Sequence, residues 1–135
     1  MSLSEPVNGR PKSLLDLANR VVSGQQQFDP AVREFLDHFY ADASDRSACI
    51  AETPPAVGEI EDAYLAAVAE HLALSYDLLI PPWTEAPSRC LHRPFFAGGV
   101  ESLKAILIAE SPTAFRRRLI FVSADALSRP RTETG

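Results

Sequence analysis

The placement of proline is the feature of this chain that most limits how it can fold. Eleven of the 135 residues are proline, and six of them lie between positions 54 and 94. Proline lacks a backbone N–H and its ring clashes with the preceding helical turn, so a helix tolerates it only in the first turn. Residues 77–98 contain four of the six prolines, yet Trp83, Leu91, Phe95 and Phe96 are interleaved with them. We therefore predict a packed, ordered Pro-rich loop at 77–98, and long ordered loops are often functional.

Outside this loop, apolar residues recur with helical spacing. The clearest pattern starts at Asp29-Pro30, a capping residue followed by a proline, and puts apolar side chains at 32, 35, 36, 39 and 40 on one face. The segment 100–110 is apolar nearly all round, which is typical of a helix at the centre of a fold. These patterns predict an all-α protein, a single compact domain of about five to six helices. The other predicted helices lie near 11–23, 44–52 and 59–76, and directly after the Ser111-Pro112 capping signal.

The length of the chain favours a single domain. A domain of this size buries about two thirds of its unfolded surface, so it needs no disulfide or metal to fold. We predict a helical domain at residues 11–128 between a disordered N-terminus at 1–10 and a disordered tail at 129–135. Two cysteines are too few for a disulfide framework, residues 1–13 do not resemble a signal peptide, and no apolar run reaches the roughly 20 residues of a membrane span. A cytoplasmic protein that does not enter a membrane is expected.

Charge is unevenly distributed along the chain. Residues 1–80 carry 13 acidic and 5 basic side chains, whereas residues 81–135 carry 5 acidic and 8 basic ones, for a net charge of −5. The basic part can meet the acidic part within the fold, or it can meet a phosphate or an acidic partner. Consecutive residues on a helix point about 100° apart, so at least one of the three arginines at 116–118 should face solvent or a partner. Arginine is favoured where a carboxylate or phosphate is held by two hydrogen bonds.

Two polar residues lie where the helical pattern predicts apolar surroundings. Glu110 falls between apolar positions of its helix and needs a cationic or N–H partner, for which the arginines at 116–118 are nearest. That pairing either fixes a corner between two helices or orients the arginines toward a partner. His71 falls on an apolar stripe beside Tyr64. A buried imidazole must hydrogen-bond, so Tyr64 and His71 form a possible buried polar site, satisfied internally or used for pH sensing or ligand binding.

No pattern of catalytic residues is recognisable. The chain has no Gly-rich phosphate loop, no serine elbow and no Cys/His dyad spacing. Cys90 and His92 could bind a metal with Cys49 or His71, but a single short pair is a weak signal because zinc needs three or four ligands. We therefore predict no catalytic residue, no metal and no cofactor, and expect that the protein is not an enzyme.

Six sequence blocks resemble a group of short, largely uncharacterised bacterial proteins. The most specific block is Glu-Ser-Pro-Thr-Ala-Phe-Arg-Arg-Arg at 110–118. This group in turn resembles antitoxins paired with nucleotidyltransferase-like toxins. Some of its members carry a helix-turn-helix domain in front of this module, and residues 1–10 are too short for one. The other blocks lie at 33–40, 69–73, 87–96, 101–104 and 120–124.

The resemblance implies a non-enzymatic partner-binding protein, the antitoxin of a toxin–antitoxin pair, whose loop and basic corner cover an acidic toxin site. A second hypothesis is a nucleic-acid-associated transcriptional regulator using the basic C-terminal half, against which an isoelectric point of about 5.1 argues. A third is a small-ligand binder or enzyme with a pocket formed by Trp83, His71 and Glu110. The candidate partner-binding residues are Trp83, Arg89, Arg93, Phe95, Phe96, Glu110, Arg116, Arg117 and Arg118.

Overall fold

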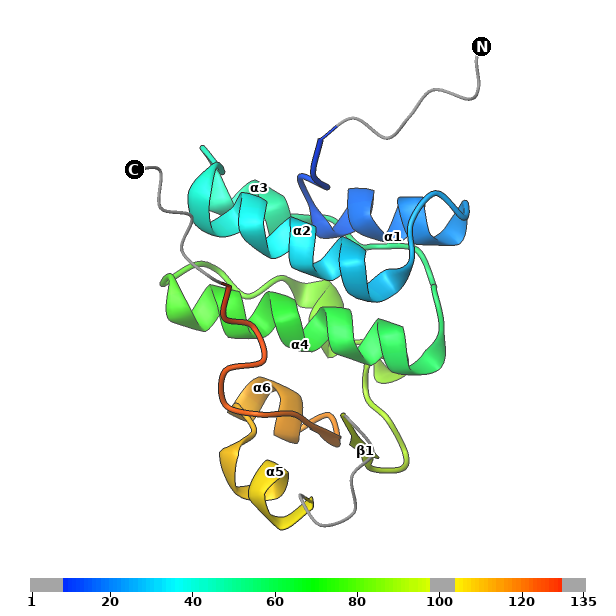
Figure 1. The fold of residues 1–135 in the computed structure, drawn as a ribbon, viewed down its shortest axis with the longest axis vertical. Helices are drawn as coiled ribbons and strands as arrows, with labels where there is room; N and C mark the ends of the chain where they lie inside the picture. The colour runs from blue at the N-terminus through cyan, green and yellow to red at the C-terminus, as the bar shows by residue number, and fades with distance from the viewer. Residues whose placement is uncertain (1–8, 98–103, 130–135) are drawn as a thin grey trace.

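The computed structural model describes residues 9–97 and 104–129, and its elements stack in three layers (Figure 1). The described residues are mostly helical and contain six α-helices, which confirms the predicted all-α class with five to six helices. The first layer holds α1 (Leu14–Val22), α2 (Phe28–Ala41) and α3 (Arg46–Ala51), and α4 (Glu59–Ser75) crosses the middle. The third layer holds α5 (Lys104–Glu110), α6 (Thr113–Arg116) and two short strands, β1 (Phe95–Phe96) and β2 (Ile120–Phe121).

Two helices of the first layer, α1 and α3, begin at side-chain caps, whereas the N-cap of α2, Gln27, makes no side-chain cap hydrogen bond. The Ser13 hydroxyl accepts a hydrogen bond from the Asp16 N–H at 2.9 Å and so caps α1. The Asp45 carboxylate caps α3 by accepting a hydrogen bond from the Ala48 N–H at 3.3 Å. Helix α2 begins at Phe28, one residue before the predicted start, with Asp29 in its first turn. Its predicted apolar face is confirmed, with Val32, Phe35, Leu36 and Phe39 buried and Tyr40 partly buried.

The central helix is α4, and the prediction that 100–110 would occupy the centre is wrong. Alanines at 63, 66, 67, 69 and 73 of α4 are completely buried, because their small side chains let neighbours pack closely on several sides. In contrast, Ile106 is 49% and Ile108 46% exposed, and Leu107 is the buried residue of α5. Helix α5 lies at the outer edge of the third layer, where one of its faces contacts the domain (Figure 1). Residues 98–103, including the start of the predicted helix, lie outside the described residues.

The Pro-rich loop is ordered over its described length, residues 77–97. It forms two short 3-10 turns at Pro82–Glu85 and Pro87–Arg89, both packed against α4, with a proline in the first turn of each. The loop then enters β1, which pairs in parallel with β2 through Phe95 with Ile120 and Phe96 with Phe121. The rings of Phe96 and Phe121 stack with centroids 4.9 Å apart. Two prolines thus start turns in the loop instead of interrupting a helix.

A single serine closes the free edge of β2. Ser111 is 1% exposed, and its hydroxyl oxygen accepts a hydrogen bond from the Val122 N–H at 2.9 Å. The same hydroxyl lies within hydrogen-bond distance of the carbonyls of Leu107 and Val122, to one of which it can donate its proton. The predicted signal Ser111-Pro112 does precede α6, but Pro112 is the N-cap, and the Ser111 hydroxyl joins the end of α5 to the residue after β2 instead of capping α6.

The end of the chain returns to the first layer. The Tyr40 hydroxyl donates to the Leu127 carbonyl at 2.8 Å, and the Arg129 guanidinium lies 2.9 Å from the Asp37 carboxylate. The remainder of the predicted disordered ends, 1–8 and 130–135, lies outside the described residues. No helix within residues 9–97 and 104–129 combines the length and apolar character needed to cross a membrane.

Candidate partner-binding surface

A buried ion cluster joins α4 to the chain after α6. The Glu70 carboxylate lies 2.6 Å from a terminal nitrogen of Arg117 and 2.6 Å from one of Arg118. Arg118 is 3% exposed, and it also donates to the carbonyls of Thr84 and Ala114, each at 2.9 Å. Glu70 is itself only 7% exposed. The carboxylate that binds the arginines is therefore Glu70 of the central helix, and its desolvation is offset by charged partners.

Arg117 extends the cluster to the surface. Its side chain is 42% exposed and donates to both oxygens of Glu85, at 3.0 and 3.2 Å. Hydrogen bonds to Glu85 and Glu70 raise the pKa of Arg117, and the bond from Arg117 lowers the pKa of the Glu85 carboxyl. Two guanidinium groups thus face two carboxylates, and the corner is electrically balanced instead of basic.

The predicted link between Glu110 and the arginines is wrong. Glu110 is exposed at the end of α5, and it forms no ion pair with any arginine of the described residues. Arg116 is exposed and donates to the Ser111 carbonyl at 3.0 Å. Because α5 lies at the edge of the domain, the apolar neighbours of Glu110 along its helix do not shield it from water. The position therefore needs no charged partner.

Trp83 and Arg89 are buried, and their hydrogen bonds join the Pro-rich loop to the segment at 50–54. Trp83 is 8% exposed, and its indole N–H donates to the Ile50 carbonyl at 3.0 Å. The Arg89 guanidinium lies 4.8 Å from the centre of the Trp83 ring and donates to the Pro54 carbonyl at 2.8 Å. Arg89 is 5% exposed, and burial lowers its pKa. A partner could not contact these two side chains extensively without opening the loop.

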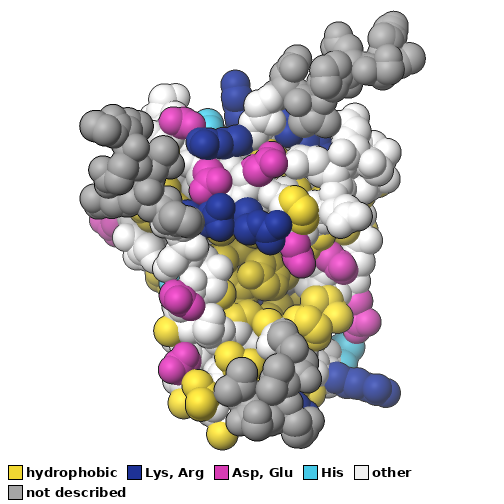
Figure 2. Space-filling view, in the orientation of Figure 1, with side chains coloured by type: hydrophobic (Ala, Val, Ile, Leu, Met, Phe, Trp, Pro, Cys, Tyr) yellow, Lys and Arg dark blue, Asp and Glu magenta, His cyan; other side chains and the backbone are white. Residues whose placement is uncertain are grey.

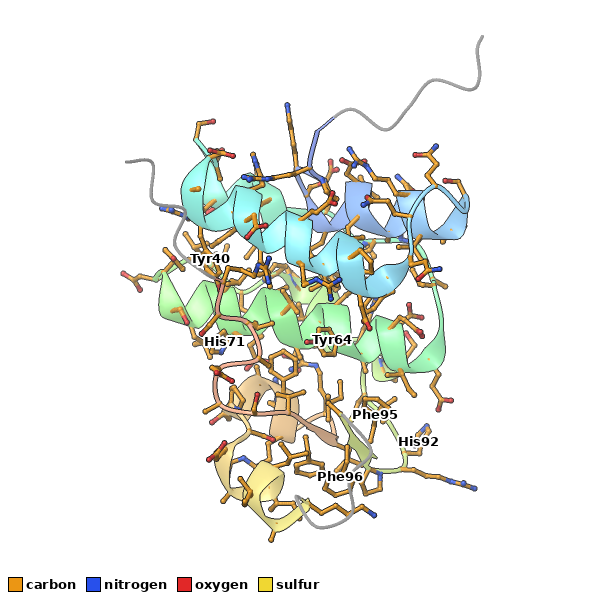
Figure 3. All side chains as sticks on the ribbon, viewed as in Figure 1. Tyr40, Tyr64, His71, His92, Phe95 and Phe96 are labelled. Carbon is orange, nitrogen blue, oxygen red and sulfur yellow. The ribbon has the colours of Figure 1, made fainter. Side chains whose placement is uncertain are left out.

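Tyr64 and His71 flank the same aromatic ring and do not bind each other. Phe115 lies 5.1 Å from Tyr64 and 6.3 Å from His71 between ring centroids, and the described contacts include no hydrogen bond between the two polar side chains. Burial raises the pKa of Tyr64 to about 12 and lowers the pKa of His71. Figure 2 shows hydrophobic side chains in a hollow near the middle of the molecule, where Figure 3 places Tyr64. The expected internal pair is therefore replaced by ring packing.

The proposed three-residue pocket does not form in the described structure. Trp83 lies against Arg89, His71 packs on Phe115, and Glu110 is exposed on α5. Within residues 9–97 and 104–129, no group of three or more His, Cys, Asp or Glu side chains is placed to hold a metal ion.

Besides Glu110, Arg116 and Arg117, three candidate residues line or border accessible surface. Arg93 is exposed, and Phe95 and Phe96 are half-buried on β1 (Figure 3). Arg93 and Phe95 border a groove of about 480 Å³ between the start of α4 and the segment after Leu91. Phe96 is partly covered by Lys104, whose ammonium nitrogen lies 5.0 Å from the ring centre.

A second accessible surface, the Leu79 segment (residues 74–80), was not anticipated from the sequence. Asp77, with φ of +57°, ends α4 in the left-handed conformation, and the Leu78 N–H closes the turn onto the Ala73 carbonyl. After this turn Leu79 is 86% exposed. The only sequence signal for this exposed surface is an apolar run just before Pro81-Pro82, and a packed loop would give the same pattern. The other exposed apolar side chains of the segment are Leu74, Tyr76 and Ile80.

Similarity to known proteins assigns no role to either surface. No protein-family model matches the chain, and neither a curated protein nor a solved structure matches it. A role must therefore be argued from the side chains of the protein itself.

Proposed function

We propose that this protein acts in the cytoplasm as a non-catalytic partner-binding protein, the antitoxin of a toxin–antitoxin pair that neutralises a nucleotidyltransferase-like toxin. The observation that carries the proposal is the exposure of the Leu79 segment. Leu74 is 59% and Leu79 86% exposed, with Tyr76 and Ile80 at 37% and 36%. Single exposed apolar residues are normal, but four large ones within seven residues are typical of an interaction site.

The backbone of this segment is also available to a partner. Neither the N–H of Leu79 nor that of Ile80 donates a hydrogen bond within the described part of the chain. Pro81 and Pro82 follow at once and restrict the conformations of the segment before binding. A partner with an apolar pocket and free carbonyl groups would fit this combination. We therefore assign the docking surface to residues 74–80 instead of to the balanced corner around Arg117.

The sequence blocks supply the partner class. The Glu-Ser-Pro-Thr-Ala-Phe-Arg-Arg-Arg block resembles a group of short bacterial proteins that in turn resembles antitoxins, and its last two arginines bind Glu70 inside the domain. We infer that this block maintains the fold that presents the Leu79 segment. The arginines then act on the toxin indirectly, through the position of the loop.

The proposal predicts that a nucleotidyltransferase-like toxin is encoded beside this gene, and co-expression of the two proteins tests it. Leu79→Asp should abolish co-purification and growth rescue, because burying one leucine contributes about 1.5–3 kcal/mol to binding and a buried aspartate opposes it. The stability of the domain should be unchanged, since Leu79 is 86% exposed. Val22→Asp is the matched control, because Val22 is 58% exposed on α1. A Leu79→Asp protein that neutralises the toxin as well as wild type would refute the proposal.

The alternative role, a nucleic-acid-associated regulator, requires a basic surface. Arg89 and Arg118 are buried, and Arg117 is paired with two carboxylates. Among the described residues of the C-terminal half, Arg93 and Arg116 are exposed and form no ion pair, and two such side chains do not amount to a basic cluster. Binding of the protein to duplex DNA at low salt would nevertheless favour this alternative.

A further inference from the structure

The groove beside α4 has walls of opposite charge. It is lined by the first two residues of α4 and by the segment after Cys90, and has a volume of about 480 Å³. Glu59 is exposed on one wall, and Arg93 is exposed on the other. The apolar lining includes Ile60, which is 37% exposed, and Phe95, which is half-buried. The complete lining is Glu59, Ile60, Leu91, His92, Arg93, Pro94 and Phe95.

The charges on the two walls are not neutralised by the domain itself. Arg117 and Arg118 both contact carboxylates, whereas Arg93 has no carboxylate within 4.0 Å among the described residues. Glu59 likewise has no basic partner in the described ranges. An unpaired cation and an unpaired anion thus lie on opposite sides of an apolar groove.

We propose that this groove is the surface through which two copies of the chain associate about a twofold axis. In a twofold interface each contact occurs twice, so Arg93 of one copy meets Glu59 of the second copy and the reverse pair forms at the other end. Residues 92–94 are exposed where they line the groove, so this wall is accessible to the other copy. Ile60 and Phe95 then meet near the axis. An apolar centre with charged edges is the usual composition of a protein interface.

Charge complementarity favours a second copy over another protein. Glu59 belongs to the part of the chain with 13 acidic and 5 basic residues, and Arg93 to the part with 5 acidic and 8 basic ones. The right-hand edge of Figure 2 shows acidic side chains above a histidine and a basic side chain, and Figure 3 places His92 there. A twofold arrangement lays the acidic wall of each copy against the basic wall of the other. Local attraction thereby opposes the repulsion expected from a net charge of −5.

Sedimentation velocity on the intact chain tests the proposal. The wild-type mass should rise from 14.8 kDa toward twice that value as the concentration increases from about 10 to about 500 μM. Glu59→Arg and Arg93→Glu should each weaken association at least about tenfold, because each places like charges opposite one another at both ends of the interface. The double variant should recover wild-type association to within about threefold. Arg33→Glu is the matched control, since Arg33 is exposed on α2 and does not line the groove.

The cysteines provide a second readout. Cys90 is exposed next to the groove and Cys49 is buried, so a thiol-reactive spin label should attach to Cys90. Wild type should give a defined label–label distance that Arg93→Glu removes and the double variant restores. A wild-type protein that stays monomeric at the highest concentration, or a double variant that does not recover, would overturn the proposal. Charge variants that lose toxin binding without changing self-association would also overturn it and would assign the groove to the toxin.

Discussion

Replacing Glu70 with glutamine tests the buried ion cluster directly. The change keeps the size of the side chain and removes the negative charge, which in the wild-type protein lies 2.6 Å from both Arg117 and Arg118. Arg117 is 42% exposed and retains Glu85 as a partner. Arg118 is 3% exposed and would stay charged in the interior.

The expected loss of stability follows from the contacts that Arg118 retains. Removing one partner of a buried ion pair costs about 3–5 kcal/mol. Arg118 still donates to the carbonyls of Thr84 and Ala114, so the lower end of this range, about 3 kcal/mol, is expected. A chain of 135 residues has an unfolding entropy of about 0.28 kcal/mol per kelvin, so Tm should fall by about 10 °C.

Urea and thermal unfolding followed by circular dichroism measure the effect. Glu85→Gln is the control: Glu85 is 55% exposed, pairs with Arg117 and lies 3.8 Å from Arg118, and loss of such a surface carboxylate costs about 0–1 kcal/mol. The double variant Glu70→Leu/Arg118→Met should be more stable than Glu70→Gln, because it leaves no isolated charge in the interior. The explanation is refuted if the free energy of unfolding of Glu70→Gln lies within about 1 kcal/mol of the wild-type value. It is also refuted if Glu85→Gln lowers that free energy as much as Glu70→Gln does.

Two further predictions concern pH and the edge of β2. Burial lowers the pKa of His71, so the unfolded chain takes up a proton at higher pH than the folded one, and stability should decrease as the pH falls below about 6.5. The free energy of unfolding, measured in urea between about pH 5 and pH 8, should depend less on pH for His71→Gln than for wild type. An equal pH dependence in the two proteins would contradict the assignment to His71. Ser111→Ala should destabilise the domain by about 1–3 kcal/mol in urea unfolding, because the buried Val122 N–H loses its acceptor. Ser123→Ala, at an exposed hydroxyl, is its control, and equal losses would contradict this explanation.

The local signals in the sequence predicted much of the fold. The apolar spacing in α2 identified its buried face, because a 14-residue helix gives the pattern several turns to repeat. Ser111-Pro112 marked the start of α6, since a proline fits the first turn of a helix and little else in a helical chain. The strands were not predictable as a pair, because each has two residues and their pairing depends on positions 25 residues apart.

The candidate site was harder to predict, because it depends on which helix is central. Both Glu70 and Glu110 lie in apolar stretches, and the pattern groups Glu70 with Glu59 and Asp62 on the polar side of its helix. The structure surrounds α4 on several sides, which buries Glu70, and leaves α5 at the edge, which exposes Glu110. Hydropathy predicted α5 as the central helix, because isoleucine and leucine are more apolar than alanine. Close packing favoured the alanines of α4, and this is a property of the assembled layers.

The contacts between distant parts of the chain have a consequence for folding during synthesis and for cleavage by proteases. The contacts of Leu127 with Tyr40 and of Arg129 with Asp37 join residues 87 and 92 positions apart. Glu70, at the centre of the domain, needs guanidinium groups from Arg117 and Arg118. A nascent chain that has not reached Arg118 leaves Glu70 without its charged partners, so the packing around α4 is completed only after this residue has been added. Cleavage before Arg117 would likewise leave Glu70 charged and unpaired in the interior, whereas cleavage after Ser123 would keep this cluster and remove the contacts to Tyr40 and Asp37.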